Sequence, residues 1–121
     1  MHLQELPQYV AIDIQEALEE RFMESEDMYV RFLRKLLTTD DYRLMEEAAE
    51  AGNLQEVLRY AHNLKGVCAT LGLIGLQAQF ADIVSLLRNE EYTVAQLQEK
   101  LVAVKHEWQR TLQYIEQLES A

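Results

Sequence analysis

Three residues in one short stretch have the side-chain types and spacing to handle a phosphoryl group: His62, Lys65 and Gly66. An imidazole in water is largely neutral near pH 7, so its unprotonated nitrogen is a nucleophile. A phosphoryl group brings nearly two negative charges, and an ammonium three residues along a helix lies close enough to offset them. A glycine one turn after the histidine leaves room for a large donor. The alternative is a solvent-exposed histidine followed by an incidental glycine.

A helical wheel places His62 outside the core face of its helix. At 100° per residue, the core arc contains Leu54, Val57, Ala61, Leu64, Cys68 and Leu71. The outer face around His62 contains Gln55, Leu58, Arg59, Lys65, Gly66 and Ala69. Glycine inside a helix costs about 1 kcal/mol relative to alanine, and no capping pattern requires Gly66. We therefore predict that Gly66 and Ala69 provide steric clearance beside the imidazole.

The rest of the sequence lacks the usual patterns of catalytic and metal sites. It has no glycine-rich phosphate loop, no His-Glu-x-x-His motif and no paired cysteines. Cys68 is the only cysteine, so no internal disulfide is possible, and we predict a buried core residue there. His2 and His106 are predicted to be solvated. We expect no cofactor, no metal and no autonomous enzyme activity.

The charge balance argues against several classes of partner. Among 121 residues, 21 are acidic and 11 basic, which gives a formal net charge of −10. Such a surface repels nucleic-acid phosphates and anionic lipid. No apolar run reaches the roughly 20 residues that a membrane span needs, and the first residues do not resemble a signal peptide. These features predict a cytoplasmic protein.

Helix start and stop signals divide the chain into several helices. We interpret residues 1–9, which include Pro7, as an N-terminal arm, and residues 10–121 as one domain. N-cap patterns predict helices that begin at Asp13, Ser25, Asn53 and Thr93. A further segment spans residues 40–51, with Thr38 or Thr39 as its N-cap and Gly52 at its end. Another spans residues 74–89, while Gly72 ends the helix that contains His62. Whether the second and third segments form one bent helix stays open.

The apolar stripes of these segments predict the fold class. The helix that begins at Ser25 has its apolar stripe at Tyr29, Phe32, Leu33, Leu36 and Leu37. The last helix has its stripe at Leu97, Leu101, Val104, Trp108, Leu112, Ile115 and Leu118. No segment shows sustained strand alternation. Stripes of this kind joined by short links predict an all-α fold, an antiparallel four-helix bundle with a short additional N-terminal helix.

The stretch Ala61-His62-Asn63-Leu64-Lys65-Gly66, followed by Gly72, resembles the signature of the histidine-containing phosphotransfer (Hpt) domain family. That signature is His-x-x-Lys-Gly with a second glycine ten residues after the histidine. The resemblance extends through Leu76 and, more loosely, covers the order of helices from about residue 10 to 120.

The resemblance implies a phosphorelay intermediate of a two-component system. His62 would carry the phosphoryl group on Nε2, with Lys65 as electrostatic support and Gly66 as clearance. The partners would be response-regulator receiver domains, which supply the aspartates and Mg²⁺, and a sensor or hybrid histidine kinase. The chain departs from the family pattern at Val84, where a glutamate or glutamine often contacts the imidazole. We expect a monomer that binds neither nucleic acid nor membrane.

A receiver must also find a docking surface near His62. A chain of net charge −10 cannot rely on long-range attraction to another acidic domain, so we expect an apolar patch. Leu58, about 40° from His62 on the wheel, is the first candidate, with Arg59 and Gln55 beside it. Ile12 and Ile14 would extend the patch if the first helix covers this end of the bundle. The alternative is that the three apolar residues belong to the core.

The rival function is a non-phosphorylated helical module for protein–protein interaction. The near-heptad stripe from Leu97 to Leu118 would then pair with a partner helix, whereas in a bundle it forms one wall of the core. Acid-labile, alkali-stable label acquired from a phosphorylated receiver would distinguish the two functions.

Overall fold

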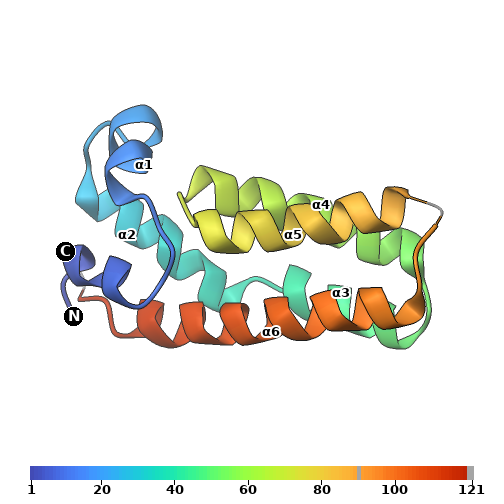
Figure 1. The fold of residues 1–121 in the computed structure, drawn as a ribbon. Coiled ribbons are helices and arrows are strands. Elements are labelled where there is room, and N and C mark those ends of the chain that lie inside the picture. The colour runs from blue at the N-terminus through green and yellow to red at the C-terminus, as the bar shows by residue number, and fades with distance from the viewer. Residues whose placement is uncertain (90, 120–121) are drawn as a thin grey trace.

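Helices make up most of the computed structural model, which describes residues 1–89 and 91–119 (Figure 1). The elements in chain order are η1 (Leu3–Gln8), α1 (Ile14–Arg21), α2 (Glu26–Arg34), η2 (Lys35–Thr38), α3 (Asp41–Glu50), α4 (Leu54–Thr70), α5 (Ile74–Arg88) and α6 (Val94–Glu116). The two η elements are short 3-10 helices. No strand occurs within these described ranges, so the predicted all-α class is confirmed.

Four helical walls form the bundle. α4 and α5 form one antiparallel hairpin, α3 packs on α4, and α6 packs on α5. α2 and α3 are separate helices that follow one another along α6, interrupted by η2 and by the extended residue Thr39. This arrangement settles the question of the bent helix. α1 lies at the end of the bundle nearer to the termini (Figure 1).

The predicted N-cap residues accept the expected backbone hydrogen bonds. In two of these caps, however, the glutamate three residues later binds an arginine. Asn53 Oδ1 accepts a hydrogen bond from the Glu56 backbone N–H at 3.3 Å. The Glu56 carboxylate, however, binds Arg59 instead of returning to the N-cap, and that hydrogen bond lowers the pKa of Glu56. A charged guanidinium is a stronger donor to a carboxylate than a backbone amide is.

The remaining helix N-termini differ in how their caps are completed. Asp13 caps α1 through Glu16 N–H, while the Glu16 carboxylate pairs with Arg21. Thr93 and Gln96 form both bonds of a capping box at the start of α6. α3 is an exception to the prediction that Thr38 or Thr39 would cap it, because its N-cap is Asp40, which makes no side-chain cap bond.

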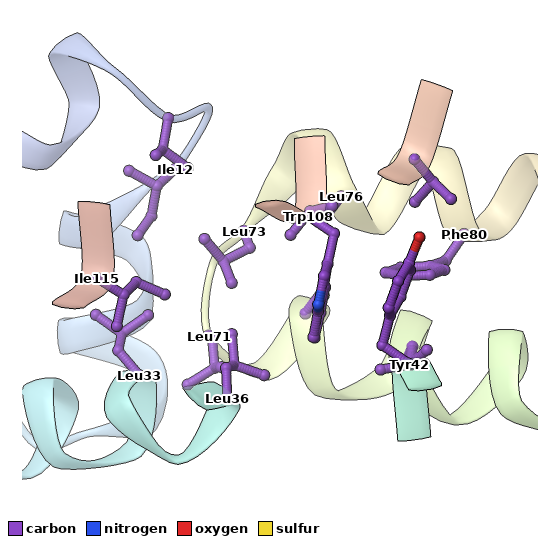
Figure 2. Close-up of a cluster of buried hydrophobic side chains, with 14 of the residues drawn as sticks. Ile12, Leu33, Leu36, Tyr42, Leu71, Leu73, Leu76, Phe80, Trp108 and Ile115 are labelled. Atoms are coloured by element: carbon purple, nitrogen blue, oxygen red, sulfur yellow. The ribbon is translucent and has the colours of Figure 1, made fainter. Parts of the chain in front are cut away.

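Large apolar side chains fill the space between the walls. Trp108 stacks on Tyr42 with ring centroids 4.9 Å apart and meets Phe80 edge-on at 6.1 Å (Figure 2). The α6 stripe faces this core: Leu97, Val104, Trp108, Ile115 and Leu118 are buried, and Leu101 and Leu112 are partly buried. The stripe proposed for a partner helix is therefore occupied inside the bundle.

The N-terminal arm contributes to the same core. Residues 3–8 form η1, and Leu3 and Leu6 are buried. The sequence showed no helical periodicity there because a 3-10 helix brings together positions i and i+3 rather than a 3.6-residue stripe. Tyr9 then stacks on Tyr114 of α6 with centroids 4.4 Å apart.

Two residues predicted to face the core lie at the surface. Leu54, in the first turn of α4, is 37% exposed, and Phe32 of α2 is 38% exposed. Leu54 is the first residue of α4. Phe32 packs edge-on against Phe22 with ring centroids 5.5 Å apart, and the Lys35 ammonium lies 4.1 Å from the centroid of its ring.

Gly72 fixes the contact between α1 and the end of α4. Its φ is +71°, and a Cβ built there would lie 2.6 Å from the Asp13 carbonyl oxygen. We expect Gly72→Ala to lower the free energy of unfolding by about 2–4 kcal/mol, since left-handed strain and the clash add. Gly52→Ala is the matched control, because φ is +72° with nothing within 4 Å of the added carbon. It should cost only about 1–2 kcal/mol. Equal losses in chemical denaturation would contradict this account.

Candidate functional site

His62 projects into solvent from the middle of α4. Its side chain is exposed, while Val57, Ala61, Leu64 and Cys68 on the same helix are buried, as the wheel predicts. Within the described residues no hydrogen bond or ion pair engages the imidazole. Both ring nitrogens are therefore open to solvent and to a reactant.

Lys65 and Gly66 stand on the turn after His62. Lys65 is partly buried, and it makes no ion pair with any described carboxylate. Gly66 is exposed, and a Cβ built there meets nothing within 4 Å. The bundle itself thus gives no packing reason for a glycine at this position. Ala69, one turn further, is partly buried and continues the low surface.

Three groups from the N-terminal region hold the C-terminal end of α4. Arg21 Nε donates to the Thr70 carbonyl at 2.7 Å, the Tyr29 hydroxyl to Leu71 at 2.6 Å, and the Asp13 N–H to Gly72 at 2.8 Å. Carbonyls at a helix end have no intrahelical partner and need such donors. Sequence analysis did not assign Arg21 or Tyr29 this role, because the donors lie 49 and 42 residues away from their acceptors.

Neighbouring groups add no polar partner to the imidazole. Val84, where the family pattern often has a glutamate or glutamine, is a buried apolar side chain of α5. Asp82 lines a groove with Glu99 and Lys100 on the α6 side. Cys68 is buried, and burial raises the pKa of its thiol to about 12, so it is not a second nucleophile.

The docking candidates on α4 have different surroundings. Leu58 is partly buried and packs against the core, with part of its surface left for contact. Arg59 is exposed, but its guanidinium binds Glu56 at 2.5 Å and lies over the Tyr60 ring at 4.5 Å. Gln55 is exposed. Of these residues, Arg59 thus has its charge compensated within the chain.

Ile12 and Ile14 do not form one patch with Leu58. Ile12 is 8% exposed and belongs to the same buried cluster as Leu73 and Ile115 (Figure 2). Ile14 lines a groove with Gln4 and Pro7 of η1. Both lie at the Gly72 end of α4, whereas Leu58 lies 14 residues earlier, or about 21 Å along a helix. The alternative weighed for Ile12, a core residue, is the one that the structure favours.

Sequence analysis missed the exposed apolar residues on the α2 side of α4. Phe32 and Val67, 38% and 40% exposed, line one groove, and Met23 is 79% exposed in the connection between α1 and α2. Phe32 had been assigned to the core. A signal was present for Val67, which lies outside the core arc of the wheel.

Two further properties concern metals and membranes. Across residues 1–89 and 91–119, no three His, Cys, Asp or Glu side chains gather into a group that could hold a metal ion. In the same part of the chain no helix has both the length and the apolar character needed to cross a bilayer.

The fold is thus an all-helical bundle that presents an exposed histidine beside a lysine and a helical glycine. A family model described as "Hpt domain" matches residues 3–121. The chain is thus a member of the Hpt domain family, whose members serve in histidine phosphotransfer in two-component signalling and act as carriers rather than catalysts. Searches of curated proteins and of solved structures gave no significant match.

Proposed function

We propose that this protein is a phosphorelay intermediate that carries a phosphoryl group on His62 between the aspartates of two receiver domains. The observation that supports it most strongly is the exposed imidazole on α4, followed one turn later by a glycine with open space around it. Hpt domains generally interact with receiver domains and histidine kinases. The proposal places the protein in the cytoplasm as a monomer.

The bond changes of phosphoryl transfer require only the His62 imidazole from this chain. The Nε2 lone pair of His62 forms the N–P bond while the P–O bond to the receiver aspartate breaks, and the electron pair leaves with the aspartate carboxylate. The Nδ1 proton stays on the ring. Transfer to the second receiver reverses these steps. Positioning and charge stabilisation supply most of the catalysis in phosphoryl transfer, and the receiver would bring the Mg²⁺.

Lys65 would stabilise the phosphorylated state by its charge. Side chains three residues apart on a helix lie about 5–6 Å from one another. At that distance, a dianion and an ammonium interact by about 1.4 kcal/mol even at the dielectric constant of water, which is a factor of about ten. We expect Lys65→Ala to slow transfer or shorten the phosphohistidine lifetime about tenfold without a change in melting temperature.

The matched control for Lys65 is Lys100→Ala, which removes a lysine of similar burial from α6. It should leave both the transfer rate and the lifetime unchanged. A Lys65→Ala protein that behaves like the wild type in single-turnover transfer and in phosphate release would show that this lysine has no electrostatic role.

Transfer of label from a receiver tests the proposal directly. Receivers from the same genome are phosphorylated with labelled phosphodonor and Mg²⁺, then mixed with the wild-type chain. The proposal expects label on the chain that is lost in acid and retained in alkali, followed by its passage to a second receiver. A wild-type chain that takes no label from any of these receivers would overturn it.

A further inference from the structure

We propose that Arg59 is a second cation for the phosphoryl group on His62, and that Glu56 holds it away from the imidazole until that group arrives. This inference rests on the proposed function and adds to it a residue that sets the lifetime of the phosphorylated state. The sequence had suggested Arg59 as a neighbour of the docking candidate Leu58, without a part in the chemistry.

Arg59 and Lys65 flank His62 on the outer face of α4. Arg59 lies three residues before the histidine and Lys65 three residues after it, so each is about 60° from His62 on the wheel, on opposite sides. Side chains three residues apart on a helix are neighbours. Because helical side chains lean toward the N-terminus of their helix, the imidazole is expected over the turn that contains Arg59. A phosphoryl group on the imidazole would then come within reach of the guanidinium.

In the unphosphorylated chain, two contacts hold the Arg59 guanidinium. Its Nη2 binds the Glu56 carboxylate at 2.5 Å, and its Nε lies 3.2 and 3.3 Å from the two carboxylate oxygens. The same Nη2 donates to the Tyr60 hydroxyl at 3.0 Å, and the guanidinium carbon lies 4.5 Å from the centroid of the Tyr60 ring. On the wheel, Glu56 and Tyr60 are about 120° and 160° from His62, beyond Arg59. Both contacts therefore draw the positive charge away from the imidazole.

The ion pair between Arg59 and Glu56 is one that a phosphoryl group can replace. The two side chains are 56% and 38% exposed, and ion pairs so open to water are weak. A phosphoryl group offers nearly two negative charges and three acceptor oxygens, against one charge and two oxygens in a carboxylate, and a guanidinium binds either of them bidentately. Glu56 lies in the first turn of α4, where the helix N-terminus stabilises its charge after the arginine leaves. The exchange therefore favours the phosphorylated state.

The two flanking cations differ in when their charge is available to the imidazole. Lys65 makes no ion pair with a described carboxylate, so its ammonium is available before and after phosphorylation. Arg59 becomes available as it exchanges the Glu56 carboxylate for the phosphoryl oxygens. Glu56 and the phosphoryl group therefore compete for one guanidinium, and the stability of the phosphohistidine depends on the balance between them.

Arg59→Gln and Glu56→Gln test the inference, because they should change the phosphohistidine lifetime in opposite directions. Each chain is phosphorylated with phosphoramidate, which forms the N–P bond to the imidazole as ammonia leaves, and the loss of label by hydrolysis is then followed. We expect Arg59→Gln to shorten the lifetime about three- to fivefold, the size that an exposed ion pair reaches. Glu56→Gln frees the guanidinium and should lengthen the lifetime about two- to threefold. An unchanged lifetime for Arg59→Gln overturns the inference.

Arg43→Gln is the matched control for Arg59→Gln. Arg43 is an arginine of α3 whose side chain is 57% exposed, and it binds carboxylates three residues before it and four after it, those of Asp40 and Glu47. Its replacement removes the same charge and the same kind of ion pair from another helix, and should leave the lifetime unchanged. If Arg43→Gln shortens the lifetime as much as Arg59→Gln does, net charge rather than the position of Arg59 is responsible, and the inference is wrong.

A double variant, Glu56→Gln with Arg59→Gln, separates competition from simple repulsion. If Glu56 acts by holding Arg59, its removal has no effect in a chain without the arginine, and the double variant has the lifetime of Arg59→Gln alone. If the Glu56 carboxylate instead repels the phosphoryl group directly, the double variant outlives Arg59→Gln by the same factor that Glu56→Gln gains over the wild type, and the competition is refuted. Arg59→Lys keeps the charge without the planar fork, so it should recover part of the lifetime.

The movement of the arginine can be observed in the wild-type chain. In ¹⁵N-labelled protein, the Nε–H resonance of Arg59 should shift when phosphoramidate phosphorylates His62, whereas that of Arg43 should stay in place. An Arg59 resonance that is the same in the phosphorylated and unphosphorylated chains overturns the inference, while the relay role, tested by transfer from a receiver, stands. A wild-type His62 that phosphoramidate does not phosphorylate contradicts both.

Discussion

A His62→Gln protein should fold and melt like the wild type and accept no phosphoryl group from a phosphorylated receiver. His62 is exposed, and its side chain makes no hydrogen bond within the described residues, so no stabilising contact is lost. Glutamine is also at least as good a helix former as histidine. Its amide nitrogen is not a nucleophile, so acid-labile label should fall to background while the circular dichroism melt is unchanged.

His106→Gln is the control for this substitution. His106 is an exposed histidine on α6, and its replacement should leave receiver-dependent labelling at the wild-type level. Label that persists on the His62→Gln chain would assign the nucleophile to another residue. Unfolding of that chain would show that the imidazole contributes to the structure in a way that its exposed position does not suggest.

The parts of the fold that depend on local signals were predictable from the sequence. Capping by Asp13, Asn53 and Thr93 involves backbone groups three residues away, and the positive φ of Gly52 and Gly72 follows from helix-ending chemistry. By contrast, η1 escaped prediction. The residue that follows it, Tyr9, is held by α6, since its carbonyl accepts a hydrogen bond from Arg110 Nε, 101 residues away in the chain.

The candidate site also has one part that the sequence predicted and one part that it did not. The outward direction of His62 is a property of one helix, and the wheel was sufficient to find it. The docking surface is a property of several helices, because it requires knowledge of which element covers each side of α4. Sequence analysis offered Ile12 as an extension of a Leu58 patch if the first helix covered that end of the bundle, and it counted Phe32 in the apolar stripe of its helix. In the structure Ile12 is buried and Phe32 is 38% exposed, because the burial of each depends on which elements pack beside it.

The second large effect is expected from Gly66→Leu, which should raise stability and block transfer. A Cβ at this position meets nothing within 4 Å, and leucine is a better helix former than glycine by about 0.8–1 kcal/mol. The melting temperature should therefore rise by a few degrees. A leucine side chain one turn after His62 would hold the receiver away from the imidazole, and a misplacement of about 1 Å can cost about 100-fold in rate. We expect a loss of at least that size in receiver-dependent transfer.

Two comparisons decide whether steric clearance is the reason for this glycine. Phosphoramidate is small enough to pass a leucine, so direct phosphorylation of His62 should continue in the Gly66→Leu protein near the wild-type rate. Ala95→Leu places the same side chain at an exposed position of α6 and should slow neither reaction. If Gly66→Leu instead transfers normally from a receiver, the glycine is incidental and the partner does not cross this turn of α4. If it gains stability and loses only the receiver reaction, the chain has kept a less stable helix because the partner needs the space above it.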